Sequence, residues 1–254
     1  MGLHSKWENG ELVYYDGAVK ILAIPKNALQ DSYVKVPSIM GLNQKLAYRF
    51  FEDFLHSDAI AVGTMSGWAT TLVEGGGGES TLGLSETEVG GALVVTTDAF
   101  EDDGINATLN GEAFKLATGK ALYFGCRVKV SEVIQSDFMI GLTVANTAIL
   151  GGVTDGVYFR KVDAAATLAF VTEKGSSETE DADVGSMVAG AWVTLEFFFD
   201  GAGTVTAYVN GVLVATSTTT IPDTENLTVA WQFLTGEAVI KIASIDWIEV
   251  LQTR

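Results

Sequence analysis

The chain has few of the residues on which most enzyme chemistry depends. Its 254 residues include one cysteine, two histidines and three prolines. A single thiol cannot form an internal disulfide, and no cysteine–histidine cluster has the spacing of a zinc site. His4 and His56 both lie in the first quarter of the chain. The rest of the sequence therefore contains no histidine that could activate a serine or cysteine nucleophile.

Positive charge and long apolar runs are also scarce. The net charge is −17. Residues 1–49 carry six basic and four acidic residues, which leaves +2, and the remainder carries nine basic and 28 acidic residues, which leaves −19. The strongly negative charge of residues 50–254 argues against nucleic acid as a partner. No stretch approaches the ~18 apolar residues of a membrane span, and the opening residues lack a signal-peptide core, so we expect synthesis in a cytoplasm.

The clearest pattern that is present is a series of short β-strands. Residues 192–199 are apolar enough to lie between two sheets, Asp200-Gly201 is a turn, and Asn210-Gly211 is a strong hairpin signal after another strand. After Trp68, short β-rich runs alternate with Gly, Asn and Asp. This pattern predicts an all-β, two-sheet antiparallel sandwich.

The same late segment carries a family resemblance, through Trp192, Leu195, Phe197, Asp200, Gly201, Gly203, Val205, Tyr208, Val209, Asn210 and Gly211. It resembles the concanavalin-like or laminin-G-like jelly-roll family. Residues 119–130, 138–144, 156–159 and 243–250 resemble further strands of that fold, so the likeness covers about residues 68–252. It implies a jelly roll. The fold hosts lectins, glycanases, adhesion modules and virus structural proteins, so function has to be argued from other residues.

The first residues differ in character from the rest. We expect an N-terminal arm over residues 1–57 and the jelly roll over residues 58–254. Residues 11–16 and 19–24 predict a hairpin, residues 42–56 have near-helical spacing, and Pro25 and Pro37 favour extended backbone. Such an arm lies on its own domain, on a sister subunit or on a larger surface. Its aromatic residues are typical interface anchors.

Catalytic and metal-binding patterns are weak. Glycanases of this fold carry alternating carboxylates on one strand. The nearest match, Glu101-Asp-Asp-Gly-Ile-Asn106, ends in Asn and predicts a turn, and residues 178–183 predict a solvated loop. We expect no enzyme activity, no cofactor and no metal. Two acidic groups are calcium alternatives that we do not favour: Asp102, Asp103 and Asn106, and Glu180, Asp181 and Asp183. Cys126 is expected to be a buried, unreactive thiol.

The opening residues, through Tyr14-Tyr-Asp-Gly17, resemble N-terminal arms of tailed-phage capsid-associated proteins. This resemblance implies a non-enzymatic virion structural protein, a decoration or cement protein on the capsid surface. Its partners would be the major capsid protein and itself, as a trimer, with no nucleic acid and no membrane. The residues expected to make these contacts are Trp7, Tyr14, Tyr15, Lys20, Lys26, Tyr33 and Lys35. The alternative is a carbohydrate-binding module or tail-associated adhesin, with Trp231 stacking on sugar rings.

Overall fold

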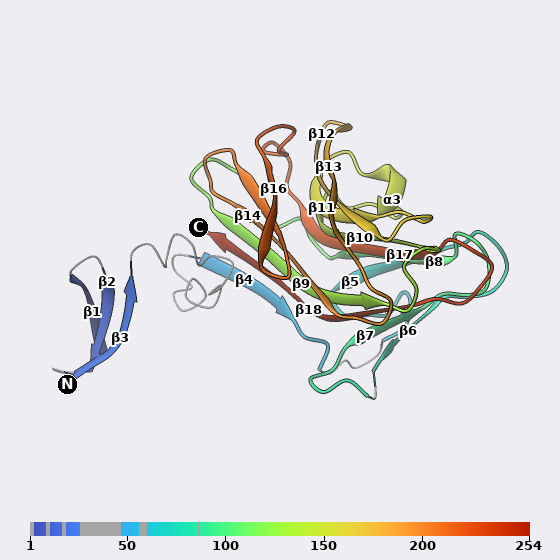
Figure 1. Ribbon diagram of the computed structural model, residues 1–254, viewed down its shortest axis with the longest axis horizontal. Coiled ribbons are helices and arrows are strands. Elements are labelled where there is room, and N and C mark those ends of the chain that lie inside the picture. Colours follow the sequence, from blue (N-terminus) through green and yellow to red (C-terminus); the bar gives the residue numbers. More distant parts are fainter. Residues whose placement is uncertain (1–2, 9–10, 17–18, 26–46, 56–59, 86) are drawn as a thin grey trace.

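In a computed structural model of the chain, most of the strands belong to two stacked antiparallel β-sheets (Figure 1). The structure describes residues 3–8, 11–16, 19–25, 47–55, 60–85 and 87–254, with side chains from residue 47 onward. The expected all-β sandwich is therefore confirmed. In the described part of the chain, no helix has the length and apolar character needed to cross a membrane.

The front sheet has seven strands in the order β13-β12-β11-β10-β17-β8-β5. All its neighbours are antiparallel. The strands are β5 (Trp68–Val73), β8 (Gly104–Leu109), β10 (Ser136–Thr143), β11 (Gly156–Lys161), β12 (Thr167–Lys174), β13 (Ser177–Ser186) and β17 (Thr228–Thr235).

The back sheet follows the order β16-β15-β14-β9-β18-β7-β6, and β4 also pairs with β18. Its strands are β4 (Ala47–Glu52), β6 (Thr81–Leu84), β7 (Leu93–Thr96), β9 (Leu122–Val130), β14 (Val193–Phe199), β15 (Val205–Val209), β16 (Val212–Ser217) and β18 (Ile242–Thr253). The long β18 runs the length of the sandwich.

A third sheet, here called the arm sheet, lies at the N-terminus. It consists of β1 (Leu3–Glu8), β2 (Glu11–Asp16) and β3 (Val19–Pro25) in that order, all antiparallel. Among the described strands these three pair only with one another. The predicted hairpin between residues 11–16 and 19–24 corresponds to β2 and β3, and β1 extends it.

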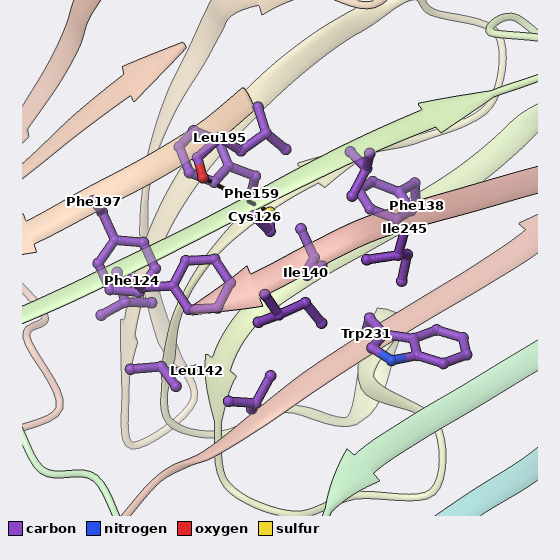
Figure 2. Packing of buried hydrophobic residues seen from close by; sticks show 14 of the residues in the cluster. Phe124, Cys126, Phe138, Ile140, Leu142, Phe159, Leu195, Phe197, Trp231 and Ile245 are labelled. Atoms are coloured by element: carbon purple, nitrogen blue, oxygen red, sulfur yellow. Dashed lines mark hydrogen bonds between the residues drawn. The ribbon is translucent and has the colours of Figure 1, made fainter. Parts of the chain in front are cut away.

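Aromatic side chains from both sheets fill the space between them (Figure 2). Phe124 and Phe197 of the back sheet stack with ring centroids 4.8 Å apart, and Phe170 of the front sheet lies 6.1 Å from Phe197. Cys126 is fully buried among them, and burial holds the pKa of its thiol well above the ordinary value. The expectation of a buried, unreactive cysteine agrees with this position, because the thiolate is the reactive form.

The hairpin that identifies the fold forms as predicted. Asn210 and Gly211 have φ angles of 51° and 75°, the positive values that a type I′ turn needs at both central residues. The Asp200 carboxylate closes the preceding turn by accepting hydrogen bonds from the amides of Ala202 and Thr204 at 2.7 and 3.0 Å. These two turns fix the register of β14, β15 and β16.

Two sequence predictions about backbone structure were wrong. Residues 47–52, expected in a helix of the arm, form β4 of the sandwich. The reason is that β7 pairs only with the first residues of β18. Along the same edge, β4 supplies the backbone pairing for Ile248–Thr253. The sandwich thus includes residues 47–52. The acidic segment 178–183, expected to be a loop, lies in β13, an edge strand on which charged residues are common.

Candidate functional site

The outward face of the front sheet gathers polar side chains from several strands. Register places Glu173 of β12 beside Gly156 of β11 on one side and directly opposite Glu178 of β13 on the other. Two carboxylates in this relation repel each other unless a donor or a cation lies between them. Tyr158 and Arg160, alternate residues of β11, supply both.

The hydroxyl of Tyr158 lies between the two carboxylates, 2.9 Å from Glu173 Oε2 and 3.1 Å from Glu178 Oε1. Arg160 donates two parallel hydrogen bonds to Glu178, at 2.8 and 2.9 Å, and also pairs with Glu180. Such a bidentate pair fixes the geometry of both side chains. The result is a connected chain of groups from the buried Glu173 to the exposed Glu178 and Glu180.

The two glutamates of this chain have pKa values displaced in opposite directions. Burial raises the pKa of Glu173, which is 4% exposed, whereas the hydrogen bonds from Arg160 lower the pKa of Glu178. A phenol has one proton to donate, so it can satisfy only one of two ionised carboxylates. The Tyr158 hydroxyl lies in donor position to both carboxylates, and the Arg160 guanidinium supplies the further donors to Glu178.

A pocket of about 320 Å³ opens beside these groups. Its floor includes Tyr158 and Glu173, its rim includes Arg160 and Glu178, and Gly151–Thr154 close the remaining side. A volume of this size is at the lower limit for small-ligand sites. The lining offers an aromatic edge, the donors of a phenol and a guanidinium, and carboxyl oxygens able to accept, which are groups that polyhydroxylated ligands use.

The centre of the same face is covered by residues 145–153, here called the plug loop, which includes the short helical turn α3 (Ile149–Gly152). Ile149 is buried against Met139, Tyr158, Val171 and Ala230 of the sheet. An apolar side chain of the chain itself thus occupies the middle of the face.

Amide side chains of the sheet hold the plug loop in place. Asn106 donates to the carbonyl of Asn146 at 2.8 Å and accepts from the amide of Ile149 at 3.2 Å. Gln232 accepts from the amide of Leu150 at 2.8 Å. Both side chains are buried, so these bonds are shielded from water.

The predicted sugar-stacking residue is not on this face. Trp231 is fully buried and points into the core, where its ring centroid lies 6.4 Å from that of Trp68 (Figure 2). The reason is strand alternation: β17 is buried on both sides, and Ala230 and Gln232 take the outward positions. Trp192, expected in the core, is instead half-buried, with Arg127 and Lys129 4.6 and 4.5 Å from its ring centroid.

The other acidic candidates are used structurally. Asp103 is buried and accepts hydrogen bonds from the amides of Gly75 and Gly76 at 2.5 and 3.0 Å. Asn106, expected in a turn, lies in the central strand β8 and fixes the plug loop. Among the described residues no group of three or more His, Cys, Asp or Glu side chains is arranged to hold a metal ion.

The predicted partner-binding residues fall in two groups. Register places Trp7 and Tyr14 among the positions of one face of the arm sheet, and Tyr15 and Lys20 among those of the other. Lys26, Tyr33 and Lys35 lie outside the described residues. Sequence reasoning missed Tyr158, Arg160, Glu173 and Glu178, which come from three strands and form no local motif.

Comparisons with known proteins agree with the fold. The family model described as the concanavalin A-like lectin/glucanases superfamily matches residues 139–238. The structure resembles an endo-1,3-beta-glucanase from Streptomyces sioyaensis, with a TM-score of 0.61 and 13% identity over 81% of this chain and 96% of that one.

Two further solved structures show the same likeness. A beta-glucanase from Bacillus licheniformis has a TM-score of 0.54 and 16% identity over 80% of this chain and 97% of that one. A protein of unknown function from Shewanella oneidensis MR-1 has a TM-score of 0.55 and 15% identity over 82% and 87%. The comparison with curated proteins found no match. The concanavalin A-like fold is thus supported by sequence and by structure.

Proposed function

We propose that this chain is a non-enzymatic virion structural protein, a decoration or cement protein that binds the surface of a phage head through its N-terminal arm. The observation that carries the proposal is the arm sheet, which pairs with no described strand of the sandwich. Its two outer strands, β1 and β3, each present an unpaired edge among the described strands. Natural proteins seldom leave such edges without a partner or a cover.

The state of the front sheet supports a structural role. A retaining glycanase needs two carboxyl groups about 5–5.5 Å apart in an open groove. Here the plug loop covers the middle of the face, and the outward positions of β11 carry Tyr158 and Arg160. The acidic body also suits a particle surface, because copies that repel each other do not aggregate when free.

The proposal is tested by co-sedimentation of the purified protein with heads of the phage that encodes it. A truncated chain that starts at Ala47 retains β4 and keeps the sandwich complete, so it is the matched control. Saturable binding by the full chain and its loss in the truncated chain are expected. Equal binding by both would place the site on the sandwich and refute the role of the arm, and no binding by either would refute a head-decoration role.

A second candidate function is carbohydrate binding at the pocket beside Tyr158, and the observation that favours it is the set of oppositely displaced glutamates that line it. Calorimetry with β-1,3-glucan oligosaccharides tests this. The Glu178→Gln variant should weaken any binding, while Glu225→Gln, at an exposed position elsewhere, should not. Assay of the same mixtures for new reducing ends separates binding from hydrolysis.

A further inference from the structure

One face of the arm sheet is mainly apolar, with Ser5 and Asp16 as its polar positions. Residues paired across an antiparallel sheet belong to the same face. The register therefore groups Trp7 with Leu12 and Ile24, and Ser5 with Tyr14 and Leu22. The positions of the other face alternate with these and include His4, Lys6, Glu8 and Glu11. A three-stranded sheet with one apolar face needs something to cover that face.

The sandwich has a matching apolar surface at one end. Six large aliphatic side chains there are 41–66% exposed: Ile134, Val162, Val188, Val239, Ile240 and Ile242. We call this surface the apolar end. The loops that carry it are joined by hydrogen bonds, from Ser131 N to the Ile242 carbonyl at 2.7 Å and from Gly236 N to the Gln135 carbonyl at 3.0 Å. A cluster of exposed aliphatic side chains of this kind usually marks an interaction site.

The apolar end lies at the opposite end of the sandwich from Ala47, where the chain coming from the arm enters β4. Ile242 begins β18 at the apolar end, and Thr253, paired with Ala47 of β4, lies at the opposite end. Twelve strand residues separate the two ends, a distance of about 40 Å at ~3.3 Å per residue.

Charge decides which part of a second copy can approach the apolar end. Acidic residues lie beside it: Asp98 and Asp163, and Glu132 and Glu237, which both pair with Lys241. Residues 47–254 carry ten basic and 28 acidic residues, which leaves −18, whereas residues 1–46 carry five basic and four acidic residues, which leaves +1. A second sandwich is repelled, and a nearly neutral arm is not.

We infer that the apolar face of the arm sheet of one copy docks on the apolar end of a second copy. The contact is heterologous, since it joins different surfaces of the two molecules, and repeated copies form a ring where the rotation between them closes. It deepens the proposed function by naming a second copy as the partner of one arm face. The opposite face of the arm sheet remains available for the head surface.

The size of the arm sheet sets the strength of each contact. Three strands of six or seven residues form a face of about 20 by 14 Å at ~3.3 Å per residue and ~4.8 Å between strands. This is well below the ~800 Å² per partner of a standard stable interface. A single contact should therefore be weak, with association appearing at tens of micromolar, and ring closure or a shared surface should strengthen it.

The experiment is sedimentation velocity on the full chain between about 1 and 200 µM, a range chosen to bracket a weak interface, without phage heads. The mass should rise from the 26.9 kDa monomer to oligomers as concentration increases. Leu12→Asp on the arm face and Ile240→Asp at the apolar end should each remain monomeric. Val13→Asp, at the neighbouring arm position, and Val89→Asp, at a fully exposed position in another loop, are the matched controls and should associate normally.

Mixing the two monomeric variants distinguishes this contact from the symmetric alternatives. The Ile240→Asp chain has an intact arm and the Leu12→Asp chain an intact apolar end, so their mixture should form a one-to-one heterodimer. Self-association of Ile240→Asp alone would show arm-to-arm contact, and self-association of Leu12→Asp alone would show end-to-end contact. Either result, or a wild-type monomer throughout, overturns the inference. Because no heads are present, this outcome is independent of the head-binding test.

Discussion

The hydrogen bonds of Asn106 predict how strongly the plug loop is held. In Asn106→Ala, two of the three bonds between sheet side chains and the loop are lost, those to Asn146 O and Ile149 N. The third, from Leu150 N to Gln232, remains. At a net value of about 1 kcal/mol for each buried bond, the loop should open more easily by about 2 kcal/mol, or roughly 30-fold in its opening constant.

Amide hydrogen exchange measures this change. The informative amide is that of Leu150, because its acceptor Gln232 is unaltered by the substitution, so faster exchange there reports opening of the loop. It should exchange roughly 30-fold faster. Asn110→Ala, at an exposed turn position, is the control and should leave the rate unchanged. Unchanged exchange at Leu150 in Asn106→Ala would refute the view that these amide side chains keep the face closed.

Three further predictions concern buried groups. Trp231→Ala should lower the free energy of unfolding by about 3–5 kcal/mol in chemical denaturation, whereas Trp192→Ala, at a half-buried position, should cost far less. Burial raises the pKa of Glu173 in the folded protein. The stability that this residue contributes is therefore fully present below its unfolded-state pKa and is lost as the pH rises through its folded-state pKa. Relative to wild type, Glu173→Gln should thus gain stability between pH 4 and 8, by ~1.4 kcal/mol per unit of difference between the two pKa values, while Glu225→Gln should not. Cys126 should react with a thiol reagent only on unfolding; rapid labelling of the native protein would contradict its burial.

Local signals in the sequence were sufficient to predict the fold. Asn210-Gly211 has the backbone angles that its identity predicts, and the apolar run before it became β14 between β9 and β15. These features depend on neighbouring residues only, so a single sequence contains them. The family resemblance rested on the same residues and was supported by the comparisons.

Predictions that depended on which side a strand presents were less successful. Along β17 the residues Val229, Ala230, Trp231 and Phe233 are all apolar, so alternation could not say which set faces the core. Trp231 was assigned to the wrong face for that reason. At residues 47–52, Tyr48 and Phe50 pack against the core with a spacing that fits a strand, but a helix fits the wider segment equally well from sequence alone.

The pocket residues could not have been grouped from sequence. Tyr158 and Arg160 are adjacent to Glu173, Glu178 and Glu180 only through the pairing of β11 with β12 and of β12 with β13. The positive φ of Ser176, in the turn between β12 and β13, sets that register. The sequence signal for the turn was Gly175-Ser176, but the acidic residues after it were taken for a loop rather than for an edge strand.

The plug loop also bears on the choice between the two functions proposed for the chain. A ligand lying along the middle of the front sheet has to displace Ile149 and break three side-chain hydrogen bonds. At about 1 kcal/mol for each bond and about 2 kcal/mol for the apolar side chain, displacement costs at most about 5 kcal/mol. At that upper limit the cost lowers the affinity of the ligand by more than about 10³-fold, because each 1.4 kcal/mol is a factor of ten. The pocket beside Tyr158 avoids it, but it holds only about 320 Å³ and does not suit a long glycan chain. The apolar end carries no such cost, because nothing has to be displaced from its exposed aliphatic side chains before a partner binds them. On this reasoning the apolar end is more ready to bind a partner than the middle of the front sheet is.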